Sequence, residues 1–368
     1  MWIHFALFAA LLLPAALLGL RGNAGRRGSR VILVVAFVAF VAFSSMRAVS
    51  VGNDTVEYHR VFEEIKATTS LQEAFTVSRF EYGYVLVNYL VSRLTQDFNI
   101  LLLITSVFVY GSVVLFIKRY AASYSLAVLF AFGMSVFYDL MLAVRQGIAV
   151  AIFLLAVPAL MERKLVRYVL LVVLASQFHV SVLLLLVVYL IPYMRLSTFG
   201  DWFKWGALIG IVMFSLSWLL TWLLISSAYY GHYLHSDYAD GGVRSATVLL
   251  IITRIILLLL AATCGWNASV EADPSGRTRN LLALAVADVA MVVISLGFNL
   301  LDRLEMYLTL PFAVGLANLA AHGERPERSY VSALLVVIAF AATTIFFLYR
   351  PEWYHLFPYR TVFEKGAL

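Results

Sequence analysis

Charged residues are scarce in this sequence. Of its 368 residues, 13% are charged and 62% are apolar, and the mean hydropathy is +0.90. Soluble domains are roughly 25% charged and about 45–50% apolar, and a soluble globule has too little interior to hide so much apolar side chain. The composition therefore excludes a soluble enzyme, a secreted domain, a disordered chain and a fibre. It indicates an all-α, polytopic integral membrane protein.

Sequence signals for disulfides, metals and nucleotides are also lacking. The single cysteine, Cys264, lies in an apolar stretch and forms neither an internal disulfide nor a cysteine-based metal site. There is no GxxxxGK[ST] loop and no GxGxxG after a strand, so no nucleotide is implied. His232 and His235 lack a carboxylate–histidine frame for zinc, and the nearest approach to an Asp-x-Asp clamp is Glu271-Ala-Asp273. We expect no cofactor, no metal and no nucleic-acid partner.

Ten apolar stretches are long enough to cross a bilayer, which takes about 20 helical residues. The first stretch, 2–20, has its arginines after it, the reverse of a cleaved signal peptide, so we interpret it as a span with its N-terminus outside. The ten stretches are 2–20, 31–49, 98–117, 123–139, 141–161, 205–225, 246–266, 280–298, 304–321 and 330–348.

Three further apolar stretches are short or divided. We predict that 82–95 does not cross, and that 165–178 and 180–194 form a hairpin of two short helices that enters from one side and turns back near His179. Nearly all short basic loops then face one side, which the positive-inside rule makes cytoplasmic. These loops hold Arg21 to Arg30, Lys118 with Arg119, Arg163 to Arg167, Arg195 with Lys204, Arg277 with Arg279, and Arg325 with Arg328.

The opposite side is predicted to carry the long polar loops. Residues 50–81 hold six carboxylates and an amphipathic helix suited to the membrane surface, and residues 226–245 are rich in Tyr, His, Gly and Asp. No internal repeat or separable soluble domain stands out, so we interpret 1–368 as one polytopic membrane domain. Because long loops carry function more often than short ones, we expect a functional site on this outer face.

Ionisable residues at membrane depth are costly and are candidates for function. Arg145 lies in an apolar stretch, and Gln146 beside it adds further donors. Snorkelling or a structural pair with Asp139 is the alternative interpretation of Arg145. His179 falls at the predicted helix break, where irregular backbone is tolerated if it lines a cavity. The alternative for His179 is a satisfied core histidine.

Three arginines are expected on the outer side. Arg47 ends the second span, Arg303 lies in the turn between two late spans, and Arg145 is the third. Guanidinium groups bind a diphosphate through charge-assisted, bidentate hydrogen bonds. A solvated turn is the alternative for Arg303. The set predicts an anion site at the outer mouth of the bundle.

Carboxylates of the first outer loop are candidates for acid–base chemistry. Asp54, with Glu57 three residues later, also resembles a helix N-cap with a capping box. Glu81 begins the short apolar stretch 82–95 and faces the same outer compartment. Capping therefore competes with a catalytic role for Asp54 and Glu81.

Five short motifs occur in order between about residues 44 and 310. They are Arg47 with Val51-Gly52-Asn53-Asp54-Thr55 and Tyr58, Glu81-Tyr82-Gly83-Tyr84, Arg145-Gln146 with Ala149, Arg163-Lys164 with Phe178-His179 and Ser181, and Arg303 with Tyr307. The ordered set resembles the EpsG family, whose members are Wzy-like polymerases of bacterial exopolysaccharide and O-antigen. Asn53 departs from the family's frequent Thr, and the final fifty residues lie outside the resemblance.

The resemblance implies a polytopic glycosyltransferase of the bacterial inner membrane, with its active site on the periplasmic face. Its substrates would be oligosaccharide repeat units on undecaprenyl diphosphate, and the growing glycan would pass from one lipid to the non-reducing end of another unit. Metal and nucleotide would not be needed. The implied partners are the lipid-linked donor and acceptor, the bilayer and, as a candidate, a chain-length regulator.

Two other functions are alternatives. One is an O-antigen ligase or another polyprenyl-lipid-dependent glycosyltransferase, although such enzymes often have an adjacent acidic pair where this sequence has Asp54 and Glu57. The other is a transporter or flippase of lipid-linked glycans. Transporters often contain inverted repeats and paired broken helices, whereas this sequence has one clear break, at His179, and no repeat.

The expected mechanism assigns a role to each candidate residue. The arginines hold the diphosphate and stabilise the charge on the leaving group. A base must take the proton of the acceptor hydroxyl, and a carboxylate is favoured over His179, which would be a positioning group. The candidate bases are Asp54, Glu81 and His179. The diphosphate set is Arg47, Arg145, Gln146 and Arg303. The tyrosines expected along the sugar path, or alternatively in an interfacial belt, are Tyr58, Tyr82, Tyr84, Tyr229, Tyr230, Tyr233 and Tyr307.

Overall fold

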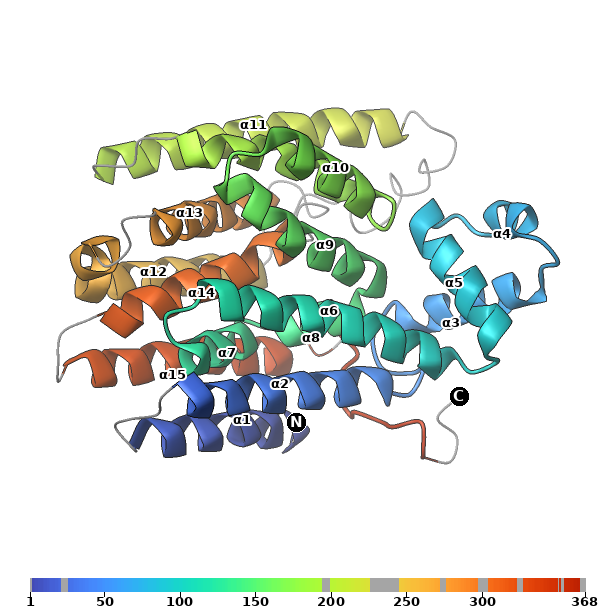
Figure 1. Ribbon diagram of the computed structural model, residues 1–368, viewed down its shortest axis with the longest axis horizontal. Coiled ribbons are helices and arrows are strands. Elements are labelled where there is room, and N and C mark those ends of the chain that lie inside the picture. Colours follow the sequence, from blue (N-terminus) through green and yellow to red (C-terminus); the bar gives the residue numbers. More distant parts are fainter. Residues whose placement is uncertain are drawn as a thin grey trace.

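The computed structural model describes residues 2–20, 26–193, 199–225, 245–271, 276–296, 304–322, 327–349, 351 and 354–364. Within these ranges the chain is helical, which confirms the predicted all-α class. The longer helices lie side by side, and a group of short helices projects at one end of the bundle (Figure 1). The longer helices are α1 (Trp2–Leu20), α2 (Arg26–Ser45), α6 (Phe98–Tyr120), α9 (Val144–Met161), α11 (Phe199–Ile225), α12 (Ser245–Glu271), α13 (Arg277–Ser295), α14 (Met306–His322) and α15 (Glu327–Tyr349). The shorter ones are α3 (Thr55–Ala67), α4 (Leu71–Val77), α5 (Tyr82–Leu94), α7 (Tyr124–Gly133), α8 (Val136–Leu142), α10 (Leu165–Ser176) and the 3-10 helix η1 (Val180–Tyr193).

Three helices of the described residues are long and apolar enough to cross a membrane. They are α6, α9 and the Tyr330–Tyr349 part of α15, and the bent pair of α7 and α8 makes a fourth if it counts as one span. Shorter apolar helices of 10–17 residues accompany them, including parts of α1, α2, α12 and α14. The chain is therefore a membrane protein with three to four full-length candidate spans. The count of ten full spans stays a prediction.

The stretch 123–139 is a broken element and not the single straight span that we expected. α7 ends at Gly133, α8 begins at Val136, and the two axes differ by 58°. Ser135 at the break has a φ of 64°, in the left-handed region that non-glycine residues rarely adopt. The Thr343 hydroxyl of α15 donates to the Gly133 carbonyl at 2.6 Å and so satisfies an acceptor near the break. α8 ends at Leu142, and α9 begins at Val144.

Residues 165–193 form the predicted hairpin as far as the structure describes it. The Tyr168 hydroxyl near the start of α10 donates to the carbonyl of Leu185 in η1 at 2.5 Å, and the Arg163 side chain donates to the Pro192 carbonyl at 2.5 Å. Because the start of α10 meets the end of η1, the two helices run antiparallel. His179 lies in the turn between them, which agrees with the predicted pair of short helices. That the pair enters the membrane and leaves on the same side stays a prediction.

The short helices α3, α4 and α5 pack together at one end of the bundle (Figure 1). α3 is the predicted amphipathic helix, but its apolar face is buried against α5 and α6 and is not left open to a membrane surface. Phe62, for example, is fully buried and packs on Phe98 of α6. α5 has 13 residues and spans about 20 Å, too short for a hydrocarbon core of about 30 Å. This length agrees with the prediction that 82–95 does not cross.

The chain after α15 returns to α2 near Arg47. The Tyr359 hydroxyl donates to the Phe43 carbonyl at 2.5 Å, and Arg47 and Thr361 form an isolated antiparallel bridge. The segment 354–364 therefore holds the backbone where α2 ends. Its role was not expected, because the final fifty residues matched no motif.

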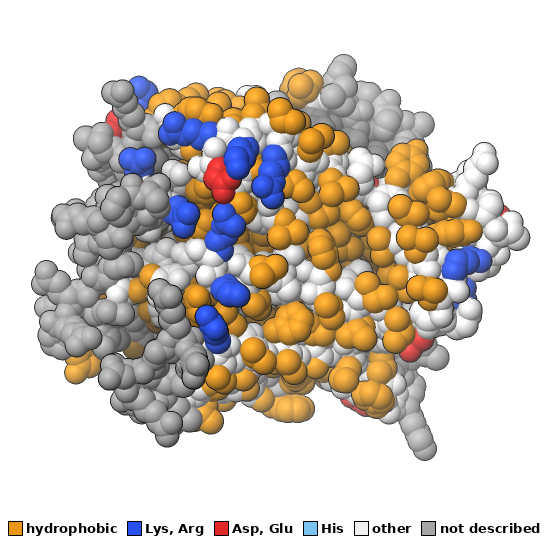
Figure 2. Space-filling view, viewed as in Figure 1, with side chains coloured by type: hydrophobic (Ala, Val, Ile, Leu, Met, Phe, Trp, Pro, Cys, Tyr) orange, Lys and Arg blue, Asp and Glu red, His pale blue; other side chains and the backbone are white. Residues whose placement is uncertain are grey.

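One face of the molecule carries a wide apolar surface with a row of Lys and Arg side chains beside it (Figure 2). On the sequence, Lys118 and Arg119 end α6, and Lys164 and Arg167 flank the start of α10. An apolar surface bordered by Lys and Arg side chains is typical of a membrane protein at a membrane–water interface.

Candidate active site

The N-terminus of α5 docks on the tip of the α10–η1 hairpin. The Gly83 N–H donates to the Gln177 carbonyl at 2.8 Å, and a Cβ on Gly83 would lie 2.6 Å from that same oxygen. Only glycine permits so close an approach between the two backbones. The contact brings Glu81, which precedes α5, next to His179 at the hairpin tip.

Glu81 lies between the side chains of Arg145 and His179. Its Oε2 forms an ion pair with the guanidinium of Arg145, and its Oε1 lies 3.4 Å from Nδ1 of His179. The three side chains are only 13–16% exposed. Burial raises the pKa of Glu81, but the hydrogen bond with His179 and the charge of Arg145 outweigh burial and lower this pKa to about 2. Glu81 is therefore ionised across the neutral range.

Arg145 lies in the first turn of α9, against aromatic rings. Its guanidinium carbon lies 3.9 Å from the centre of the Phe80 ring and 6.0 Å from that of Tyr58, both within cation–π range. The alternative pairing with Asp139 is not the one adopted. Asp139 instead accepts a hydrogen bond from the Tyr354 hydroxyl at 3.0 Å.

Arg47 is buried, 1% exposed, where α2 ends. Its Nη1 donates to the Ser44 carbonyl at 2.5 Å and to the Ser44 hydroxyl at 3.1 Å. Nε and Nη2 have no hydrogen-bond partner, and no carboxylate pairs with Arg47 in the described part of the chain. A buried guanidinium with unpaired nitrogens is energetically costly, because buried polar groups are nearly always hydrogen-bonded. An anion bound to Arg47 would lower this cost.

Arg47 and Arg145 both lie near the tyrosine pair formed by Tyr58 and Tyr84, whose ring centres are 5.7 Å apart. Both guanidinium groups are close enough to interact electrostatically with the two tyrosine hydroxyls. Tyr84 is fully buried, and its hydroxyl has no hydrogen-bond partner among the described residues. The fold thus brings together four of the residues that the sequence singled out.

The remaining predicted residues fall into different places. Tyr307 is buried beside the hairpin, where its hydroxyl lies 3.2 Å from that of Ser181. Gln146, 2% exposed, follows Arg145 into α9. Tyr82 is 66% exposed and packs edge-on against Phe75, so it lies apart from the buried cluster.

Asp54 is at the N-cap position of α3, but its side chain makes no cap hydrogen bond. Its Oδ2 instead accepts from the Tyr58 hydroxyl at 3.5 Å. Glu57 pairs with Arg60 and Arg79, so the suggested capping box is not formed. Arg303, the turn before Leu304, the loop 226–244 and the tyrosines Tyr229, Tyr230 and Tyr233 lie outside the described residues.

A second charged cluster was missed by sequence reasoning. Arg254 of α12 pairs with Asp288 of α13, and its Nη2 lies 3.1 Å from Oε2 of Glu305 and 3.3 Å from the Thr309 hydroxyl. Arg254 and Asp288 are single charges in apolar stretches, the same signal that marked Arg145. Since two carboxylates surround one guanidinium, this cluster has no positive charge left for an anion and ties α12, α13 and α14 together.

No group of three or more His, Cys, Asp and Glu side chains that could hold a metal ion occurs in the ranges that the structure describes.

The fold and the site define an all-helical membrane protein with a buried polar cluster at one end of its bundle, built around two arginines. The EpsG family model matches residues 30–361, nearly the whole chain. The chain belongs to the EpsG family, a family of Wzy-like polymerases. This match extends through Thr361 and so includes most of the segment after α15 that the motifs did not reach. Searches of curated proteins and of solved structures find no match.

Proposed function

We propose that this protein is a glycosyltransferase that polymerises lipid-linked oligosaccharide repeat units at the outer face of the bacterial inner membrane. The donor is a glycan on undecaprenyl diphosphate, and the acceptor is the non-reducing end of another lipid-linked unit. The observation that carries the proposal is a buried arginine, Arg47, and a largely buried one, Arg145, near the Tyr58–Tyr84 pair. Glu81 and His179 lie next to Arg145 in the same cluster. Family membership supports the polymerase class.

Both arginines bind the donor diphosphate, but within the described residues only Arg145 already has a carboxylate partner. Arg47 has no carboxylate partner and two unpaired nitrogens in the described part of the chain, so it can take up an anion without giving up an existing ion pair. Arg145 shares its charge with Glu81 but lies next to the same tyrosines. As the bond between the anomeric carbon and the diphosphate oxygen breaks, these guanidinium groups stabilise the charge left on the diphosphate.

The geometry favours His179 as the base, the reverse of the order expected from the sequence. Glu81 faces Nδ1 of His179, so Nε2 points away from Glu81. A carboxylate whose pKa is lowered to about 2 is a poor proton acceptor at neutral pH. His179 takes the proton of the acceptor hydroxyl as that oxygen forms the new glycosidic bond, while Glu81 orients the ring. Asp54, linked to the cluster through Tyr58, is the second candidate base.

The hairpin supports the proposal of a site on the outer side of the membrane. α10 begins beside the basic residues Lys164 and Arg167, and its other end meets the N-terminus of α5. The positive-inside rule assigns the basic end to the cytoplasm. On this assignment the cluster at the hairpin tip faces the outer side, where lipid-linked units would be presented.

The test is incubation of the purified protein in detergent with lipid-linked repeat units, read as a ladder by mass. A ladder of increasing repeat number supports polymerisation and excludes pure transport, because detergent leaves no second compartment. A single transfer to an acceptor lipid without repeats would instead favour a ligase. Folded protein that leaves the units unchanged would refute the proposal.

A further inference from the structure

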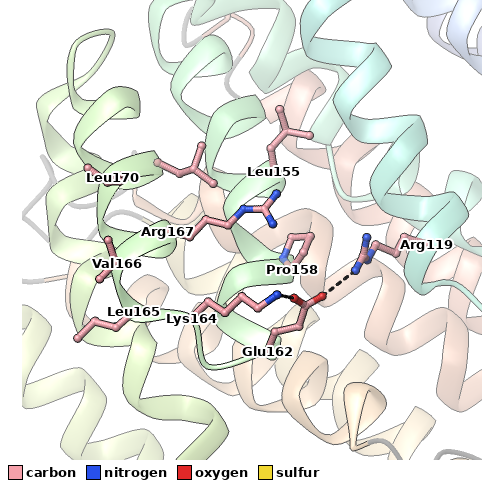
Figure 3. Close-up of a pocket in the computed structure, with 10 residues that line it drawn as sticks. Arg119, Leu155, Pro158, Glu162, Lys164, Leu165, Val166, Arg167 and Leu170 are labelled. Atoms are coloured by element: carbon pink, nitrogen blue, oxygen red, sulfur yellow. Dashed lines mark hydrogen bonds and ion pairs between the residues drawn. The ribbon is translucent and has the colours of Figure 1, made fainter.

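A pocket of about 1010 Å³ lies at the base of the α10–η1 hairpin, at the opposite end of α10 from His179 (Figure 3). The end of α6, the end of α9 and the start of α10 line it. Its charged lining residues are Arg119, Glu162, Lys164 and Arg167, and the other lining residues are apolar. The proposed transfer reaction uses none of these residues.

The pocket carries excess positive charge. Glu162 lies 3.2 Å from Nη2 of Arg119 and 2.7 Å from Nζ of Lys164, so one carboxylate links two cations. Figure 3 shows Arg167 reaching toward the same space above Pro158. Arg167 makes no ion pair or hydrogen bond within the described ranges. Three cations and one carboxylate leave a net charge of +2.

Exposed apolar side chains continue from these cations along α10. Leu165, Val166 and Leu170 are 52%, 72% and 63% exposed and line the pocket. Basic groups next to open apolar surface suit a molecule with an anionic head and a hydrocarbon tail. A small soluble anion would use only the cations, and an acidic protein segment would leave the apolar side chains uncovered.

We propose that this pocket binds an anionic phospholipid of the inner leaflet. The headgroup phosphate lies among Arg119, Lys164 and Arg167, where it accepts charge-assisted hydrogen bonds. An acyl chain lies along Leu165, Val166 and Leu170. Arg167 is the principal ligand, because Arg119 and Lys164 already share Glu162.

The test measures binding of dioctanoyl phosphatidylglycerol to the full chain, purified in a neutral detergent, from the shift of its thermal unfolding midpoint during titration. Dioctanoyl phosphatidylcholine tests the need for net negative charge, and inorganic phosphate tests whether a free anion suffices. The variant is Arg167→Gln, with Arg167→Lys as the conservative change. The matched control is Lys118→Gln, an exposed cation near the same end of α6 that does not line the pocket.

We expect saturable binding of phosphatidylglycerol, and no saturable binding of phosphatidylcholine or of inorganic phosphate. Arg167→Gln should weaken it about fivefold, the effect of roughly one cation near a membrane surface, whereas Arg167→Lys and Lys118→Gln should leave it within about twofold. Equal binding of phosphatidylcholine or of inorganic phosphate would overturn the proposal, as would no binding of phosphatidylglycerol. An equal loss with Lys118→Gln would also overturn it, because the attraction would then be diffuse. These outcomes do not depend on polymerase activity, so they leave the proposed reaction untouched.

Discussion

Oε1 of Glu81 lies 3.4 Å from Nδ1 of His179, although one residue precedes α5 and the other lies in the turn of a distant hairpin. The contact depends on the close backbone approach at Gly83. It links the group of short helices to the α10–η1 hairpin, so a displacement of either element changes the contacts of the Glu81 carboxylate.

Replacing Glu81 by Gln should lower the stability of the protein. The change leaves the largely buried Arg145 without its carboxylate, a loss of about 3 kcal/mol for a broken buried pair. Since the pKa of Glu81 is lowered, its contribution is present above the ordinary Glu pKa of about 4.3 and is lost as the pH falls through about 2. The unfolding midpoints of the parent protein and of Glu81→Gln should therefore differ by a constant amount from pH 7 to pH 5 and converge at lower pH. Convergence already between pH 7 and pH 5 would contradict the ion pair.

His179→Gly should reduce the rate of chain growth by about 10²–10⁴, the usual contribution of a general base. Added imidazole should restore part of this rate, because it supplies the missing proton acceptor in the space left by the ring. Glu81→Gln should reduce the rate without imidazole rescue. The measurement is the initial rate of ladder formation by purified protein, and an undiminished rate in His179→Gly would assign the proton transfer to another residue.

Arg145→Ala should abolish long polymer in cells. Loss of one charge-stabilising donor in a transition state typically costs about 10²–10³ in rate. The control is Arg60→Ala, because the Arg60 side chain is 52% exposed and forms surface ion pairs of little energetic value. Polymer length is read from extracted polysaccharide at equal protein level. Full-length polymer from Arg145→Ala would remove the diphosphate role of Arg145.

Arg47→Met should separate function from stability. The variant removes a buried charge that has no carboxylate partner, so its unfolding midpoint should equal or exceed that of the parent while chain growth is lost. Arg254→Met is the contrasting control, because it strands Asp288 and Glu305 and should lower the midpoint. A large loss of stability in Arg47→Met, comparable to that of Arg254→Met, would make Arg47 a structural residue.

Gly83→Ala should impair activity by pushing α5 away from the hairpin. The added Cβ would lie 2.6 Å from the backbone oxygen of Gln177, which cannot yield as a side chain could. Gly111→Ala is the matched control, since its Cβ meets nothing nearer than Phe37 at 4.0 Å and should gain about 0.5–1 kcal/mol of helix stability. Rates of chain growth and unfolding midpoints test both. Parental activity in Gly83→Ala would show that the approach of α5 to α10 is dispensable.

Much of the architecture and several site residues could be predicted from the sequence. A charge in an apolar stretch is costly wherever the chain folds, so Arg145 and His179 stand out locally. The hairpin was predictable because 165–194 is too long for one span and is interrupted at His179. The same signal marks Arg254 and Asp288, which were overlooked although it was equally clear.

The partners of these residues came from the tertiary structure. Glu81 rather than Asp139 pairs with Arg145, 123–139 breaks at Ser135, and the segment 354–364 returns to Arg47. Helices that are apolar on most sides show no single hydrophobic face in the sequence. The hydrophobic periodicity therefore does not show which helices pack against each other. Local hydropathy thus determines which charges need a partner, whereas the packing of the helices selects the partner and with it the chemical role of each residue.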